Sequence, residues 1–196
     1  MRFIKDYVLP LFSGMIMALP LALFVRGFAS LRQRKLNIST TQAHEIGAAL
    51  LVMYCGGILS LLVMEVPAVP EWPNMAYNFI PLRFMYDMFS GRYAGEHAAA
   101  LAKVLGGAAL FVPLGFMLSL LWRGASWAKA LLGAAALSLF VELCQLVMPY
   151  RIADIDDVIF ASLGGFLGFC VYRLIKAEAV ERFRVNKIKK LTNLRE

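Results

Sequence analysis

Five long apolar runs restrict this chain to a membrane fold. They cover residues 8–25, 46–64, 104–122, 130–148 and 158–175. A helix of 18 or 19 residues is about 28 Å long, close to the ~30 Å thickness of the hydrocarbon core. Hydrophobic residues make up 60% of the chain and charged residues only 17%, well below the roughly one quarter typical of soluble domains. The sequence therefore predicts an all-α, polytopic membrane helix bundle with about five transmembrane helices in a single domain.

The first run has an alternative interpretation as a cleaved signal peptide, because Arg2 and Lys5 precede it. It is longer than a typical signal-peptide core, however, and no convincing small-residue cleavage site precedes Arg26. We expect it to be a transmembrane helix.

Lysine and arginine residues are distributed unequally between the two sides of the predicted bundle. Fourteen fall in 26–45, 123–129 and the segment from Arg173 onward, whereas six fall on the opposite side. Because cytoplasmic loops carry the excess of positive charge, the sequence predicts a cytoplasmic C-terminus and an external N-terminus in the cell membrane. The net charge of +7 then requires no nucleic-acid partner. Residues 176–196 form a basic cytoplasmic tail that either binds anionic headgroups or is simply solvated.

The external segment 65–103 is rich in proline and aromatic residues. Aromatic rings favour the membrane–water interface, so one interpretation is a loop lying on the bilayer. The other is a lid over an outward-facing pocket, with Arg83 or Arg92 binding a phosphate or carboxylate.

Polar residues gather where the fourth run meets the fifth. Glu142 is the one carboxylate inside an apolar run, and ionisable residues at such depth are functional candidates. Gln145 follows one helical turn later. The segment that connects the fourth run to the fifth contains Arg151, Asp154, Asp156 and Asp157. Asp156 and Asp157 are expected to stabilise the start of the fifth helix. Crowded carboxylates can share a proton, bind Mg²⁺ or Ca²⁺, or pair with arginine, and the spacing does not choose among these. The sequence indicates no cofactor, and a bound divalent cation is consistent with it.

Small residues repeat every four positions along the fifth run, at Ala161 and Gly165 and at Gly164 and Gly168. This pattern lets helices approach closely, so we expect this face to pack against another transmembrane helix.

Four segments in order resemble the VanZ-like family over residues 75–175: Asn78–Leu82, Leu110–Phe116, Val141–Gln145 and Arg151–Asp157. The family is named for a protein linked to teicoplanin resistance. The resemblance implies a membrane protein whose matching site residues are Glu142, Gln145, Arg151, Asp154 and Asp157. Gly107 and Ala161 stand where the family pattern usually has asparagine, so two of its polar groups are absent here.

Three functions are consistent with these features. The first is a non-catalytic envelope protein that binds a lipid-linked cell-wall precursor or a glycopeptide at an outward-facing acidic site, through Gln145, Arg151, Asp154 and Arg83. The second is a membrane enzyme acting on a polyprenyl or glycolipid substrate, with Glu142 and Asp157 as acid–base or metal-binding groups. The third is a proton-coupled carrier; five helices and the absence of an inverted repeat place it last.

Overall fold

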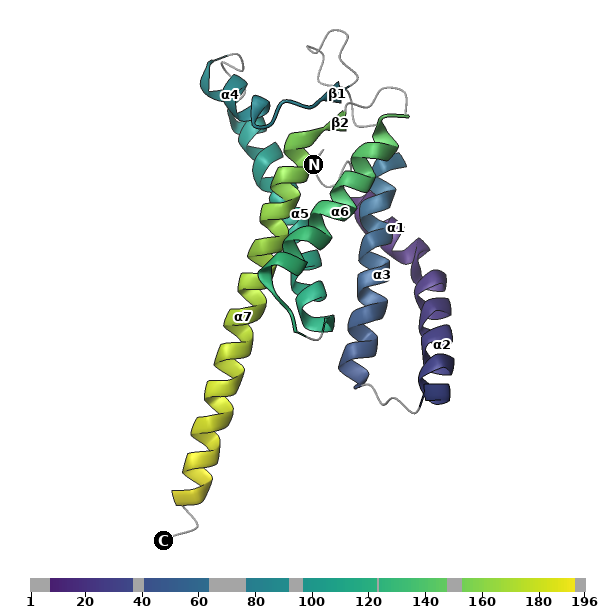
Figure 1. Ribbon diagram of the computed structural model, residues 1–196, viewed down its shortest axis with the longest axis vertical. Coiled ribbons are helices and arrows are strands. Elements are labelled where there is room, and N and C mark those ends of the chain that lie inside the picture. Colours follow the sequence, from purple (N-terminus) through teal and green to yellow (C-terminus); the bar gives the residue numbers. More distant parts are fainter. Residues whose placement is uncertain are drawn as a thin grey trace.

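The computed structural model describes residues 8–36, 41–63, 77–91, 97–122, 124–147 and 153–192. The described residues form helices and one pair of two-residue strands (Figure 1). In chain order the elements are α1 (Leu9–Met17), α2 (Leu19–Leu36), α3 (Gln42–Val63), β1 (Tyr77–Asn78), α4 (Arg83–Phe89), α5 (His97–Leu121), α6 (Trp127–Gln145), β2 (Ala153–Asp154) and α7 (Ile155–Thr192).

Four of these helices, α3, α5, α6 and α7, are long and apolar enough to cross a membrane, which confirms the predicted all-α membrane fold. The predicted 8–25 span differs from the observed structure, because α1 and α2 meet at a 40° bend. Pro20 lies just past that break, in the first turn of α2. It has no backbone N–H, and its ring displaces the carbonyl group four residues earlier, so a straight helix is disfavoured here. Counting the bent pair as one span gives five.

α7 packs closely against both α5 and α6. A Cβ atom added to Gly164 or Gly168 would collide with the backbone carbonyls of Ala108 and Val112 on α5. One added to Gly165 would meet Ala134 and the backbone of Ala130 on α6. The predicted close-packing face is therefore confirmed, and it faces two neighbouring helices.

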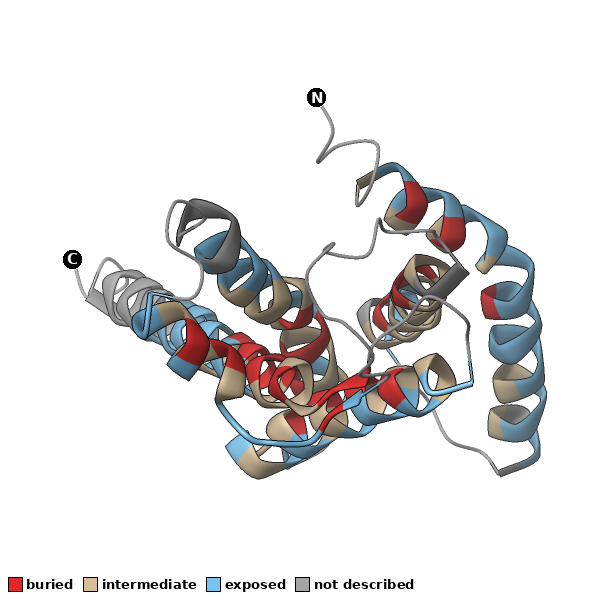
Figure 2. Cartoon of the chain, turned by 90° about the horizontal axis from the view of Figure 1, so that it is seen from above, coloured by how far each residue is buried: buried red, intermediate tan, exposed pale blue. Residues whose placement is uncertain are grey.

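The buried core lies between α3, α5, α6 and α7, and the outward faces of these helices are exposed (Figure 2). Many of the exposed residues are large and apolar. Tyr54 on α3 and Phe111 and Leu114 on α5 belong to this core, together with Ala134 and Ala161. The Tyr54 hydroxyl donates a hydrogen bond to the Leu110 carbonyl. Such an outward-facing apolar surface is expected where lipid, rather than water, surrounds the helices.

α6 begins after Ser126, whose side chain accepts a hydrogen bond from the Lys129 amide at 3.3 Å. The lower end of α2, the α5–α6 connection and the C-terminal half of α7 all lie toward the same end of the bundle (Figure 1). These are the segments that carry most of the positive charge. β1, β2 and α4 lie at the opposite end, which we call the site end (Figure 1).

α7 is a single helix of 38 residues. It starts three residues before the predicted fifth run and continues through the basic segment as far as Thr192. The segment predicted as an external loop also contains more structure than expected, because β1 and α4 lie within it and α5 already begins at His97.

Candidate functional site

Two short strands bring distant parts of the chain together at the site end. β1 and β2 pair in parallel, with Tyr77 opposite Ala153 and Asn78 opposite Asp154. This pairing holds the aromatic segment that precedes α5 against the start of α7. The polar side chains that meet there come from α5, α6, α7 and both strands, and we call them the polar cluster: Asn78, Lys103, Glu142, Asp154, Asp156 and Asp157.

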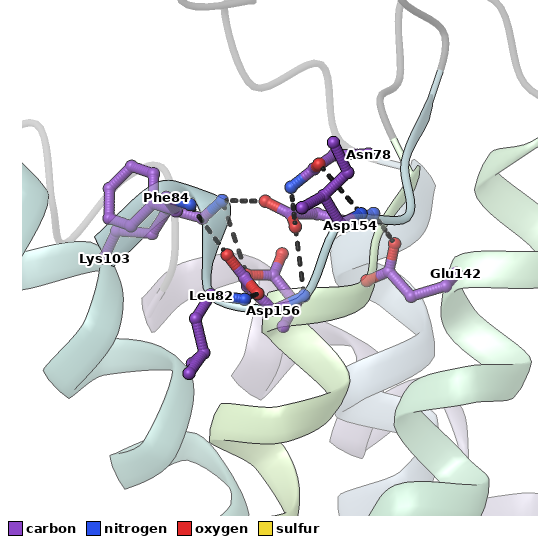
Figure 3. Close-up of polar contacts among 9 residues, drawn as sticks. Asn78, Leu82, Phe84, Lys103, Glu142, Asp154 and Asp156 are labelled. Carbon is purple, nitrogen blue, oxygen red and sulfur yellow. Dashed lines mark hydrogen bonds and ion pairs between the residues drawn. The ribbon is translucent and has the colours of Figure 1, made fainter. Parts of the chain in front are cut away.

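Asp154 is the centre of the polar cluster (Figure 3). Its Oδ1 atom accepts hydrogen bonds from the Asn78 side-chain amide at 2.9 Å and from the Asp156 backbone amide at 3.0 Å. Its Oδ2 atom accepts a hydrogen bond from Lys103 Nζ at 2.8 Å. Because Asp154 directly precedes α7, the bond from the Asp156 amide makes it the N-cap residue of that helix.

Asp156 stabilises a different helix from the one expected. Its side chain is fully buried and accepts hydrogen bonds from the backbone amides of Leu82 and Phe84, the latter at 2.9 Å. Those amides belong to the start of α4, where the first N–H groups have no partner within the helix. Asp156 and Asp157 do lie in the first turn of α7, but the side chain that caps α7 is that of Asp154.

Glu142 joins α6 to β2. Its side chain is buried, and Oε2 accepts a hydrogen bond from the Asp154 backbone amide at 2.7 Å. The predicted proximity of Glu142 and Asp154 is therefore present, but it is a contact of the Glu142 carboxylate with the Asp154 main chain.

Lys103 is the cation of the cluster, and in the sequence it stands out only as one of the six positive charges on the predicted external side. Its Nζ lies 2.8 Å from Asp154 and 3.4 Å from Asp157 Oδ1, and 4.7 Å from the centre of the Phe84 ring. The side chains of Lys103 and Asp157 are 39% and 38% exposed, so this pair is the accessible part of the cluster. A signal was present, because Lys103 precedes the third run directly and so belongs to the same membrane boundary as the aspartates.

Of the other predicted residues, Gln145 is half-buried and makes no hydrogen bond to the described residues of the cluster. Arg83 begins α4, with Nε 3.8 Å from Oδ2 of the buried Asp87 in the same helix. Arg92 and Arg151 lie outside the described residues. Asn78 entered the sequence analysis only through the family-like segment Asn78–Leu82.

A small cavity of about 60 Å³ adjoins the cluster between α6 and α7. Glu142 and Asp154 contribute to its wall, and the other lining residues are apolar: Phe79, Leu139, Leu143, Leu146, Ala153, Ile155 and Val158. The cavity therefore offers an apolar surface directly beside fixed carboxylates.

Within the described part of the chain, there is no group of three or more histidine, cysteine, aspartate or glutamate side chains that could hold a metal ion. The arrangement there is one of carboxylates bonded to amides and to one lysine.

A family model described as VanZ/LLP1 matches residues 46–176 of this sequence. This chain belongs to the VanZ/LLP1 family. The match begins in α3, earlier than the segments that carry the resemblance, and ends in α7, so it contains the whole polar cluster. No curated protein and no solved structure matches the chain.

The two positions where the family pattern usually has asparagine lie one helical turn deeper than the cluster. Gly107 follows Lys103 by four residues on α5, and Ala161 follows Asp157 by four residues on α7. Ala161 is fully buried, and a Cβ atom on Gly107 would lie 3.7 Å from that of Phe160. The structure has apolar packing at both positions, beneath the Lys103–Asp157 pair.

Proposed function

We propose that this VanZ-family membrane protein acts in the cell envelope as a non-catalytic binder of an amphiphile. The ligand is a lipid-linked cell-wall precursor or a glycopeptide such as teicoplanin. It binds at the site end, which faces outward, and binding alters glycopeptide susceptibility. The orientation rests on the positive charge at the opposite end, which is typical of a cytoplasmic face.

One observation carries the proposal: the accessible ion pair and the apolar cavity share Asp154. Asp154 binds Lys103 on one side and forms part of the cavity wall on the other. An amphiphile has a polar head and an apolar chain, so adjacent charged and apolar surfaces suit it. Lys103 offers N–H donors to a phosphate or carboxylate, and Asp157 offers an acceptor to an amine or hydroxyl.

The bonding of the carboxylates favours binding over catalysis. Glu142 and Asp156 are buried, and each accepts backbone hydrogen bonds within the fold. A general acid or base must reach a proton on the substrate, directly or through one water molecule. Carboxylates that hold the main chain in place are better suited to maintaining the shape of a binding surface.

The enzyme hypothesis is favoured by one feature, the place of Glu142 in the cavity wall. The cavity surface itself is apolar, so proton transfer to a bound polyprenyl or glycolipid substrate would require the Glu142 carboxyl group to turn toward it. The two functions predict different results for Glu142→Gln, because the amide oxygen still accepts the Asp154 N–H bond but the side chain no longer transfers a proton.

The experiment measures ligand affinity and cellular function in parallel. The protein is placed in lipid nanodiscs and titrated with teicoplanin and, separately, with an undecaprenyl-linked precursor. The variants are Lys103→Met, Asp157→Asn and Glu142→Gln. Lys129→Met at the opposite end is the matched control, because Lys129 contacts the Trp122 ring and the Gly124 carbonyl. It lies near the start of α6, roughly 20 Å along the helix from Glu142. A deletion strain carrying each variant is then tested for teicoplanin susceptibility.

We expect Lys103→Met and Asp157→Asn to weaken binding at least tenfold and to mimic the deletion, whereas Lys129→Met and Glu142→Gln behave as wild type. Unchanged affinity in both Lys103→Met and Asp157→Asn would refute the binding site. Loss of function in Glu142→Gln with wild-type affinity would instead support the enzyme.

A further inference from the structure

α4 and the residue before it, Leu82, expose an apolar stripe, whereas the helix buries a charged side chain. Leu82, Tyr86 and Phe89, at spacings of four and three residues, form one stripe and are 51%, 73% and 78% exposed. On the opposite side Phe84 and Asp87 are only 8% and 2% exposed. A helix on the surface of a soluble domain has the reverse arrangement, with its apolar stripe facing the core.

The polar cluster holds α4 in this orientation. The Asp156 carboxylate binds the backbone amides of Leu82 and Phe84, and Lys103 lies over the Phe84 ring. Arg83 and Asp87 lie close together along the same helix. Rolling α4 so that its stripe faced the bundle would break the bonds to Asp156 and expose Phe84 and Asp87.

The depth of the stripe in the membrane follows from the residues that hold α4 in place. Asp156 lies in the first turn of α7, whose apolar stretch begins at Ile155, and Lys103 lies in the first turn of the apolar stretch of α5. Both mark the boundary between hydrocarbon and headgroups. Leu105 on α5, 59% exposed, continues the outward-facing apolar surface below this boundary. Figure 1 shows α4 to one side of the upper ends of α5 and α7, away from α1–α3.

We propose that the stripe of Leu82, Tyr86 and Phe89 is a membrane-contact surface. It occupies the boundary between headgroups and acyl chains in the leaflet at the site end, and Asp156 is the residue that positions it. Tyrosine favours this depth because its ring is apolar and its hydroxyl can reach water or a headgroup. This inference goes beyond the proposed function, because it holds whatever ligand the cluster binds.

Site-directed spin labelling tests the depth of the stripe. In a background with Cys55, Cys144 and Cys170 replaced by alanine, single cysteines are introduced as Tyr86→Cys or Phe89→Cys. Leu105→Cys is the reference for hydrocarbon. Glu181→Cys is the reference for water, since Glu181 lies roughly 39 Å along α7 from Ile155, beyond the ~30 Å core. The labelled protein in liposomes is measured for collisions with oxygen, which concentrates in lipid, and with a nickel chelate, which stays in water.

We expect labels at 86 and 89 to have an oxygen-to-nickel collision ratio several-fold above that at 181 and below that at 105. A ratio equal to that at 181 would overturn the proposal, because the stripe would then face water. Low collision rates with both reagents would also overturn it, since the stripe would be covered by protein such as a second copy of the chain.

The positioning role is tested in the Phe89→Cys protein by adding Asp156→Ala, with circular dichroism to verify helix content. We expect the ratio at 89 to fall toward that at 181. An unchanged ratio in a folded protein would refute the role of Asp156. If the alanine variant does not fold, Asp156→Asn, which retains one acceptor oxygen, should give a smaller fall in the same direction, and no change would again refute that role.

Discussion

The Lys103 ammonium group donates to the Asp154 carboxylate at 2.8 Å and so joins two residues that are 51 positions apart in the sequence. This contact connects the start of α5 to the residue that caps α7. It also places the one described cation of the cluster between two carboxylates, because Asp157 lies on the other side of the same ammonium group. Lys103 should therefore contribute to the stability of the site end.

Replacing Lys103 with methionine should destabilise the folded protein by about 1–3 kcal/mol, because a charged hydrogen bond is lost and two carboxylates are left beside each other. This loss of stability is smaller than the loss expected for a fully buried ion pair, because the Lys103 side chain is partly exposed. Denaturant unfolding in mixed micelles measures it. Lys103→Arg should retain part of the stability, and Lys129→Met should change it little. Equal losses for Lys103→Met and Lys129→Met would contradict the assignment.

Glu142 should matter as a hydrogen-bond acceptor more than as a charge. Glu142→Gln keeps an oxygen for the Asp154 amide and should lower the unfolding free energy by less than about 1 kcal/mol. Glu142→Leu leaves that buried N–H group without its partner and should cost about 1–3 kcal/mol. Denaturant unfolding measures both variants. The prediction is wrong if Glu142→Gln lowers the unfolding free energy as much as Glu142→Leu does.

The contact between α5 and α7 should not tolerate a methyl group at Gly168. Its Cβ atom would collide with the backbone of Val112 and Phe116, which cannot move as a side chain could. We expect Gly168→Ala to lower the unfolding free energy by about 1–3 kcal/mol. Gly106→Ala on α5 is the matched control, because nothing lies within 4 Å of the added atom. The control should be neutral or stabilise by up to about 1 kcal/mol, since alanine is the better helix former. Similar effects at both glycines would show that the close approach is absent.

Restoring the two asparagines of the family pattern should reveal coupling between α5 and α7. Ala161→Asn alone places an amide in a fully buried position and should destabilise the protein by about 1–3 kcal/mol. Adding Gly107→Asn supplies a polar partner from α5, so we expect the double variant to recover part of that loss. A double-mutant cycle measures the coupling, and strict additivity would indicate that the two side chains do not meet.

The proposed orientation predicts where reporter fusions become active. An alkaline phosphatase fusion inserted between residues 147 and 153 should be active because this enzyme needs the external compartment, whereas one after Thr192 should be inactive. Activity in the reverse order would place the polar cluster on the cytoplasmic side and exclude an outward-facing site.

Much of this arrangement could be predicted, because hydrophobic length is a local property. The 46–64, 104–122 and 130–148 runs lie within or overlap α3, α5 and α6. The start of α7 was placed to within three residues because acidic side chains and an apolar stretch meet there. The tight face at Gly164 and Gly168 was likewise visible in the spacing of small residues.

The partners of the cluster could not be predicted in the same way. Asp154 and Asp156 are two residues apart and chemically identical, yet one caps α7 and the other caps α4. The difference depends on the pairing of β1 with β2, a contact across 76 residues that no local pattern specifies. Lys103 was overlooked for the same reason, since its role appears only when α5 and α7 lie side by side.

The unbroken length of α7 has a mechanical consequence. Its 38 residues form a rod roughly 57 Å long, which extends from the polar cluster well past the opposite face of the bilayer. A tilt of about 5° around its first turn would move the far end by about 5 Å at that length. A small change of tilt beside the cap residue Asp154 would therefore be amplified along α7 into a large displacement of the basic segment.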